Sequence, residues 1–162
     1  MIVGVTGHRF YDEPTATYLT AAVRALLQEW ADDGDLRLVS SLAEGADQLV
    51  ARVAVEQGIP LDVVLPFDGY RDSLDEDHRA EFDTLLGRAD TVTELGYGDP
   101  GGDAYLAAGM ELLDRSDRLI AVWDGEGARG TGGTGEVVDA ALARGLVVAV
   151  VWPEGYSRDD SG

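Results

Sequence analysis

A glycine-rich segment, residues 125–136, has the composition best suited to phosphate binding. Six glycines fall between Gly125 and Gly135, after an apolar run at 119–123 and before a stretch with helical spacing. The main-chain N–H groups of such a loop, and the positive end of the helix that follows it, attract phosphate. Ordering so flexible a loop costs conformational entropy, and a bound ligand is a natural reason for that cost. The sequence therefore predicts a nucleotide-like ligand whose phosphate is held by residues 130–136.

This segment also offers charged side chains. Arg129 could neutralise a phosphate, and Asp124-Gly125 ends the preceding apolar run. Glu136 and Asp139 come near the start of the next helix, where a carboxylate can act as a nucleophile or stabilise an oxocarbenium ion. The first interpretation is a nucleotide-binding protein; the alternative is an N-glycosidic hydrolase or transferase with Glu136 or Asp139 as its catalytic carboxylate. The candidate ligand-binding residues here are Asp124, Gly125, Arg129, Gly130, Gly132, Gly133 and Thr134.

Residues 6–9 form an earlier loop that also suits a ligand. They include Gly7, an imidazole at His8 and a guanidinium at Arg9, and a guanidinium can pair bidentately with phosphate. The alternative is a strand-ending turn in which His8 bonds only locally. These three residues are candidate ligand-binding residues. The other histidine, His78, lies in a charged helical stretch, and we expect it to be solvated.

Residues 40–47 form a third candidate loop with two compatible interpretations. Ser41 and Glu44 have the spacing of a capping box at the start of a helix. Alternatively, Gly45 admits a ligand close to the backbone, and Glu44 or Asp47 holds ribose hydroxyls. We take Ser41, Glu44, Gly45 and Asp47 as candidate ligand-binding residues.

The elements that must position these loops alternate along the chain. Apolar runs predict strands at 2–6, 36–39, 59–65, 91–95, 119–123 and 146–152, with Pro66 closing the third. Between them, helical spacing predicts helices from Pro14 to before Gly34, before Gly58, and at 76–87, 104–115 and 135–144. This alternation predicts an α/β fold: one Rossmann-like, doubly wound domain with a mostly parallel sheet of six or slightly more strands and helices on both faces. The three candidate loops would then meet at the carboxyl edge of the sheet.

Composition limits the class of protein. The 162 residues predict one domain, 1–156, followed by a polar tail, 157–162. A formal net charge of −19 would repel nucleic acid and acidic membranes, so neither is expected as a partner. The absence of cysteine, with no signal-peptide pattern, favours the cytoplasm. No cofactor is expected, because the glycines lack the spacing of a dinucleotide-binding motif, and no metal site is expected, because the two histidines lie far apart.

Three segments together resemble the SLOG superfamily, which groups the DNA-processing protein A (Smf) domains with the LOG-type nucleotide phosphoribohydrolases, proteins also described as possible lysine decarboxylases. Residues 7–9 resemble the opening motif of several bacterial members. Residues 40–47 resemble the Ser-Gly-x-Ala-x-Gly-x-Asp loop of the DNA-processing domains, with Ser41 in place of its glycine. Residues 131–139 resemble the Pro-Gly-Gly-x-Gly-Thr-x-x-Glu motif of LOG enzymes. The resemblance covers residues 2–152 and implies a Rossmann-like fold and a nucleotide-type ligand.

The departures from the LOG motif bear on catalysis. Thr131 stands where that motif has proline, Glu136 where it has threonine, and Asp139 where it has its catalytic glutamate. Superfamily members that lack the full motif are thought to sense nucleotide-derived signals. Asp124-Gly125 and Glu136 also resemble residues of nucleoside deoxyribosyltransferases, which supports the alternative. Because LOG-type proteins pair, the resemblance also implies a homodimer.

Overall fold

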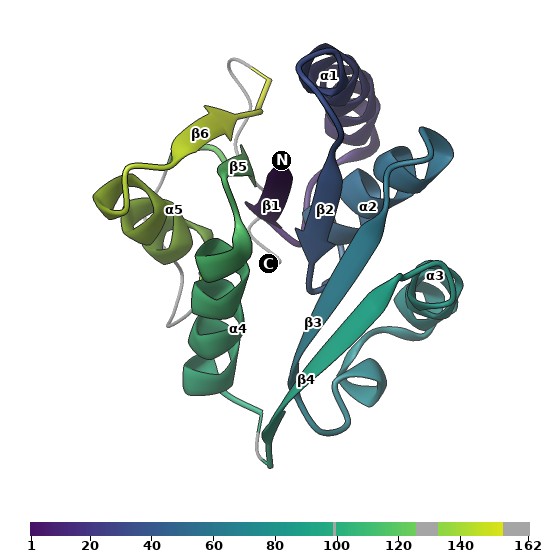
Figure 1. The fold of residues 1–162 in the computed structure, drawn as a ribbon. Coiled ribbons are helices and arrows are strands. Elements are labelled where there is room, and N and C mark those ends of the chain that lie inside the picture. Colours follow the sequence, from purple (N-terminus) through teal and green to yellow (C-terminus); the bar gives the residue numbers. More distant parts are fainter. Residues whose placement is uncertain (99, 126–132, 154–162) are drawn as a thin grey trace.

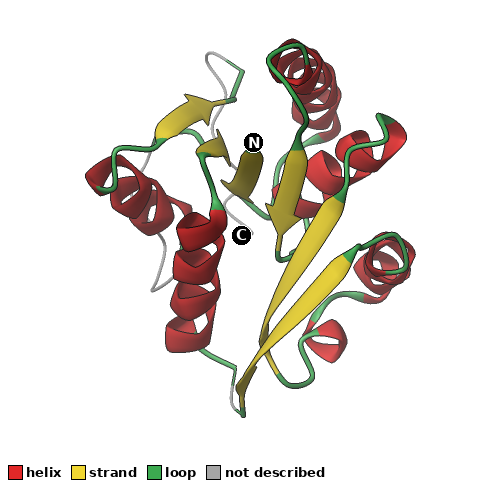
Figure 2. Cartoon of the chain, viewed as in Figure 1, coloured by secondary structure: helices red, strands yellow, loops and turns green. Residues whose placement is uncertain are grey.

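The structure is a computed structural model that describes residues 1–98, 100–125 and 133–153. Within these residues, strands and helices alternate along the chain (Figures 1 and 2). The strands are β1 (Ile2–Gly7), β2 (Arg37–Ser40), β3 (Leu61–Phe67), β4 (Thr91–Tyr97), β5 (Arg118–Val122) and β6 (Val147–Val150). The helices are α1 (Glu13–Ala31), α2 (Ala46–Glu56), α3 (Glu76–Leu86), α4 (Gly102–Arg115) and α5 (Thr134–Ala143), with a short 3-10 helix, η1 (Arg71–Ser73), before α3.

The six strands form one sheet in the order β4-β3-β2-β1-β5-β6, and every neighbouring pair is parallel. The chain winds from β1 outward to β4, and then crosses back so that β5 pairs with the other side of β1. Figure 1 shows α1, α2 and α3 on one side of the sheet and α4 and α5 on the other. The prediction of a doubly wound, Rossmann-like α/β fold is confirmed, and the winding direction reverses between β1 and β5.

A hydrophobic core fills each face of the sheet. On one face, α1 buries Leu19 and Leu27, both fully inaccessible to solvent. On the other, α4 lies close against β1 because Gly4 has no side chain: a Cβ there would be 2.5 Å from both Leu112 Cδ2 and Ser116 Oγ. A larger residue at this position would push α4 away from β1.

Several element bounds differ from the predicted ones by one or two residues, as at the ends of β4 and β6, and one difference is informative. The expectation that Pro66 closes the third strand is wrong, since β3 continues to Phe67. The register of β3 with β4 shifts between Leu65 and Phe67, so the missing N–H of Pro66 falls at an irregularity of the ladder. The predicted tail, 157–162, lies outside the described residues. Among the described helices, none combines the length and the apolar character needed to cross a membrane.

Candidate functional site

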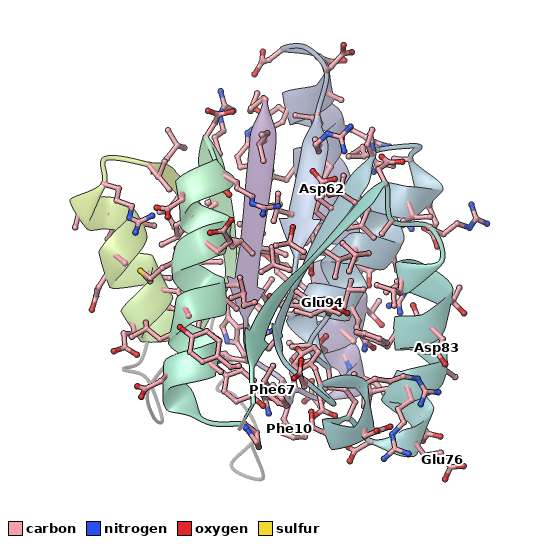
Figure 3. The ribbon with its side chains drawn as sticks, turned by 60° about the horizontal axis from the view of Figure 1, so that its bottom comes forward. Phe10, Asp62, Phe67, Glu76, Asp83 and Glu94 are labelled. Atoms are coloured by element: carbon pink, nitrogen blue, oxygen red, sulfur yellow. The ribbon has the colours of Figure 1, made fainter. Side chains whose placement is uncertain are left out.

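The carboxyl ends of the strands gather the candidate loops at one edge of the molecule. In Figure 3, Phe10, Phe67 and Glu76 lie toward this edge, whereas Asp62, near the start of β3, lies toward the opposite one. The loops after β1 and β5 begin here, on either side of the point where the winding reverses. In open α/β sheets, ligands bind in the crevice outside such a switch point.

His8 and Asp124 fasten these two loops together. The Asp124 main-chain N–H donates to His8 Nε2 at 3.1 Å, and the Asp124 carboxylate Oδ1 lies 3.0 Å from the same nitrogen. The His8 main-chain N–H donates to Val122 O at 3.0 Å, and the His8 ring contacts Trp152 edge to face at 5.3 Å. His8 is only 5% exposed, so its role here is to join the two loops within the protein interior.

Arg9 brings a positive charge to this edge. Its side chain is 42% exposed, and its guanidinium lies over the ring of Tyr105 at 5.2 Å from the centroid. Arg9 Nη1 lies 4.0 Å from Glu44 Oε1, which is longer than a hydrogen bond. The Tyr105 ring in turn packs edge to face on Phe67 at 5.5 Å and Tyr70 at 6.5 Å. An aromatic cluster from the ends of β3 and α4 therefore supports an accessible guanidinium.

The loop between β2 and α2 approaches the residues after β1 closely. Gly45 has a φ of +83°, and a Cβ there would lie 2.4 Å from the Arg9 carbonyl oxygen. The Ala46 N–H donates to His8 O at 3.1 Å, and Leu42 adopts a left-handed φ of +54°. α2 begins at Ala46 with Gly45 as N-cap and no side-chain cap. The capping box between Ser41 and Glu44 is therefore not formed.

Asp47 lies beneath this loop rather than on its surface. Its carboxylate accepts a hydrogen bond from the Ala43 N–H at 3.3 Å, and the residue is 8% exposed. Burial raises the pKa of Asp47 to about 7, against the opposing effects of the Ala43 and Ser41 amides and the charge of Arg9. Burial also raises the pKa of the nearby Tyr70 phenol, and the charge of Asp47 adds to that effect. Asp47 therefore links the loop before α2 to the first turn of that helix.

Glu44 faces a residue that the sequence pattern assigns to solvent. Glu44 is 7% exposed, and its Oε2 lies 3.4 Å from Nδ1 of His78 in α3. Gln48 Nε2 donates to the carbonyl oxygens of both Leu42 and His78 at 3.1 Å, which ties the first turn of α3 to the loop. The expectation that His78 is simply solvated is wrong for one of its atoms: the side chain is 39% exposed, but Nδ1 is buried against Glu44.

The third candidate loop is described only at its ends. Asp124 and Gly125 follow β5, and Gly133 is the N-cap of α5, with no side-chain cap. Thr134 is buried in the first turn of α5, Glu136 is half-buried beside it, and Asp139 is exposed on the next turn. Three predicted ligand-binding residues, Arg129, Gly130 and Gly132, lie outside the described residues.

Sequence reasoning did not include Tyr70, Tyr105 or His78 in the candidate site. Tyr105 and His78 lie in the first turns of α4 and α3, and Tyr70 follows β3. The Tyr105 ring packs on Phe67 and Tyr70, and no pattern within its own helix shows that it also meets Arg9. A systematic look at aromatic and titratable residues near the starts of helices would have found all three.

The comparisons with known proteins bear on the fold. A scan against protein-family models found no match, and a search of curated proteins found none either. DNA processing protein A (DprA) from Streptococcus pneumoniae superposes with a TM-score of 0.70 at 18% identity, covering 96% of this chain and 51% of that one. DprA from Helicobacter pylori gives 0.68 at 16% identity, covering 99% and 69%. The protein TM1055 gives 0.58 at 16% identity, covering 91% and 71%.

These likenesses correct one expectation about partners. The Helicobacter pylori protein has a single-stranded DNA binding mode, so a protein with this fold does bind nucleic acid, and the exclusion of nucleic acid as a partner is wrong. The physical reason is that net charge averages over the whole surface, whereas binding depends on the local field at the site. The present chain spans about half the length of the Streptococcus pneumoniae protein. At these identities the likenesses show the fold: this chain has the α/β fold seen in DNA processing protein A.

Proposed function

We propose that this chain binds a nucleotide at the edge where β1, β2 and β5 end, with Arg9 contacting its phosphate. The observation that carries the proposal is the setting of Arg9: an accessible guanidinium, held over the Tyr105 ring at the switch point of the sheet. Arginine presents its donors in a planar fork that matches phosphate oxygens. Because Glu44 is 4.0 Å away, Arg9 is not committed to a tight ion pair within the protein.

The surroundings favour a nucleotide over a simple anion. A chain with a net charge of −19 repels anions in general, so an anion must gain specific contacts to bind. The half-buried Tyr105 ring next to Arg9 offers a base or ribose an apolar surface, and Gly133 and Thr134 begin a helix whose positive end faces the same edge. The ligand class agrees with that of the Helicobacter pylori DprA, whose single-stranded DNA is itself a chain of nucleotides.

Equilibrium binding with a matched pair of arginine variants tests the proposal. Nucleoside mono-, di- and triphosphates, NAD, ADP-ribose and a short single-stranded oligonucleotide would be titrated into the wild type, Arg9→Ala and Arg24→Ala. Arg24 is the control because it lies on α1, away from this edge, where it pairs with Glu56 at 3.2 Å. We expect at least one compound to bind and Arg9→Ala to weaken it at least about tenfold, while Arg24→Ala does not.

The result also separates a free nucleotide from a nucleic acid. Binding of a mononucleotide that depends on Arg9 supports the proposal in its plain form. Binding of the oligonucleotide alone, again dependent on Arg9, assigns the site to a nucleotide within a strand. Absence of binding across the panel, or equal binding by the wild type and Arg9→Ala, would overturn the proposal.

The N-glycosidic hydrolase or transferase remains the second candidate, and the position of Glu136 favours it. This carboxylate is half-buried in the first turn of α5, close in sequence to the glycine-rich segment, whereas Asp139 is exposed. Incubation with nucleoside monophosphates followed by mass spectrometry would detect release of free base. Turnover that is lost in Glu136→Gln and kept in Asp139→Asn would assign the catalytic carboxylate; unchanged turnover in both would exclude each of them.

A further inference from the structure

Three side chains with metal-binding atoms converge beside the candidate nucleotide site. Glu44 Oε2 and His78 Nδ1 are 3.4 Å apart, and Asp75 Oδ2 is 3.9 Å from the same nitrogen. One ligand atom from each residue lies within 4.8 Å of the others. Glu44 and His78, which are 34 residues apart in the chain, thus form the centre of a cluster of one imidazole and two carboxylates.

Two atoms of this cluster are buried without a satisfied hydrogen bond. Within the described part of the chain, Glu44 Oε2 and His78 Nδ1 are the buried side-chain atoms that have no hydrogen-bond partner. The Glu44 side chain is 9% exposed, so its charge is largely removed from water. A buried polar atom left unsatisfied costs free energy, and a bound ion is one established reason for finding one.

Asp75, the third residue of the cluster, has a carboxylate that is directed toward His78. Asp75 is the N-cap of α3, yet its side chain makes no capping hydrogen bond. An N-cap aspartate ordinarily accepts a hydrogen bond from the first turn of its helix, so this carboxylate is available for another use. Asp75 and His78 lie three residues apart on the helix, and the Gln48 side chain holds the His78 carbonyl in place at 3.1 Å.

We propose that Glu44, Asp75 and His78 bind a divalent transition-metal ion of the zinc type. Zinc is bound by histidine nitrogen and carboxylate oxygen at about 2.0–2.2 Å in tetrahedral geometry, which places adjacent ligand atoms about 3.4 Å apart. The separation of Glu44 Oε2 and His78 Nδ1 matches that spacing. Glu44 Oε1, the oxygen that faces Arg9, stays directed toward the nucleotide site. Three protein ligands leave a coordination position for water or for a ligand oxygen.

Zinc binding by the untagged full chain, without nucleotide, tests this site directly. Equilibrium dialysis against zinc would compare the wild type with His78→Ala, Glu44→Gln and Asp77→Asn. Asp77 is the matched control: an exposed acidic residue in the same turn of α3, outside the cluster. We expect one tightly bound ion per wild-type and Asp77→Asn chain, and an affinity at least about 100-fold lower in His78→Ala and Glu44→Gln.

The outcomes separate this inference from the proposed function. Zinc binding that is equal in the wild type and His78→Ala, or no binding by the wild type above the level of a surface carboxylate, overturns the metal site. Because Glu44 is buried, Asp75→Asn provides a second variant at an exposed position, and it should also weaken zinc binding. Arg9→Ala should keep zinc binding even if it loses nucleotide binding, so either result stands without the other.

Discussion

The Cβ that Gly45 lacks would lie 2.4 Å from the carbonyl oxygen of Arg9. The loop before α2 therefore rests directly on the main chain that follows β1, with only hydrogen atoms between them. This approach brings Glu44 to within 4.0 Å of the Arg9 guanidinium.

Gly45→Ala should therefore destabilise the protein more than a glycine substitution at an open position. A non-glycine residue at a φ of +83° is strained by about 1–3 kcal/mol, and overpacking against Arg9 adds about 1–3 kcal/mol. Gly58→Ala is the control, because Gly58 has a similar φ of +75° with nothing within 4 Å of its Cβ position. Urea unfolding would measure both, and equal losses would contradict the close approach.

The buried carboxyl of Asp47 should make stability depend on pH. Its folded pKa of about 7 lies above the ordinary aspartate value near 4, so the folded state binds the proton more tightly than the unfolded state. Stability from this group is present below about pH 4 and is lost as the pH rises through about 7, by at most about 4 kcal/mol. Asp47→Asn should therefore lose less stability between pH 5 and 8 than the wild type.

Asp68→Asn is the control for this pH experiment, since Asp68 is an exposed aspartate and its replacement removes the same formal charge. Urea unfolding at both pH values would give the free energies. A wild type and an Asp47→Asn variant with the same pH dependence would show that Asp47 does not carry the raised pKa.

The Tyr105 ring should contribute to ligand binding through its π-face. Tyr105→Phe keeps a ring under the Arg9 guanidinium, whereas Tyr105→Leu removes it. A cation–π contact at a partly exposed site is worth about 0.5–1 kcal/mol, which corresponds to about two- to fivefold in affinity. We expect the loss only in Tyr105→Leu, measured by the titrations that test Arg9. Equal affinities for both variants would show that the Tyr105 ring does not contribute to ligand binding.

The opposite edge of the sheet should affect stability without affecting binding. Asp62 in β3 accepts hydrogen bonds from Arg37 Nη1 at 2.8 Å and Thr91 Oγ1 at 2.7 Å, and it is 8% exposed. Asp62→Ala leaves both donors without this acceptor and should cost about 1–3 kcal/mol of unfolding free energy. Asp90→Ala is the control, because Asp90 is exposed and its contact with Arg37, at 3.4 Å, is longer than that of Asp62. We expect it to cost less unfolding free energy than Asp62→Ala. Loss of nucleotide affinity in Asp62→Ala would contradict this separation.

Local patterning predicted the fold because each element carries its own signal. The helix around Leu19 and Leu27 has one apolar face, whereas strands such as β3 and β5 are mostly apolar, so periodicity distinguishes helices from strands. Their alternation then requires parallel strands with right-handed crossovers. The prediction at Pro66 was wrong because it could not include the register shift between β3 and β4. That shift depends on the neighbouring strand, and it falls where proline lacks an N–H donor.

The sequence by itself determined the order of the helices and strands and the edge of the sheet at which the loops meet. It also determined which residues form the loops at 6–9 and 40–47. Each of these results depends on patterns within single segments of the chain. Only the tertiary structure decided which side chains meet across segments. It placed His8 on Asp124, Tyr105 under Arg9, and His78 against Glu44. Such contacts join residues distant in the chain, and they depend on the crossover of the sheet and on helix packing, which no local spacing records.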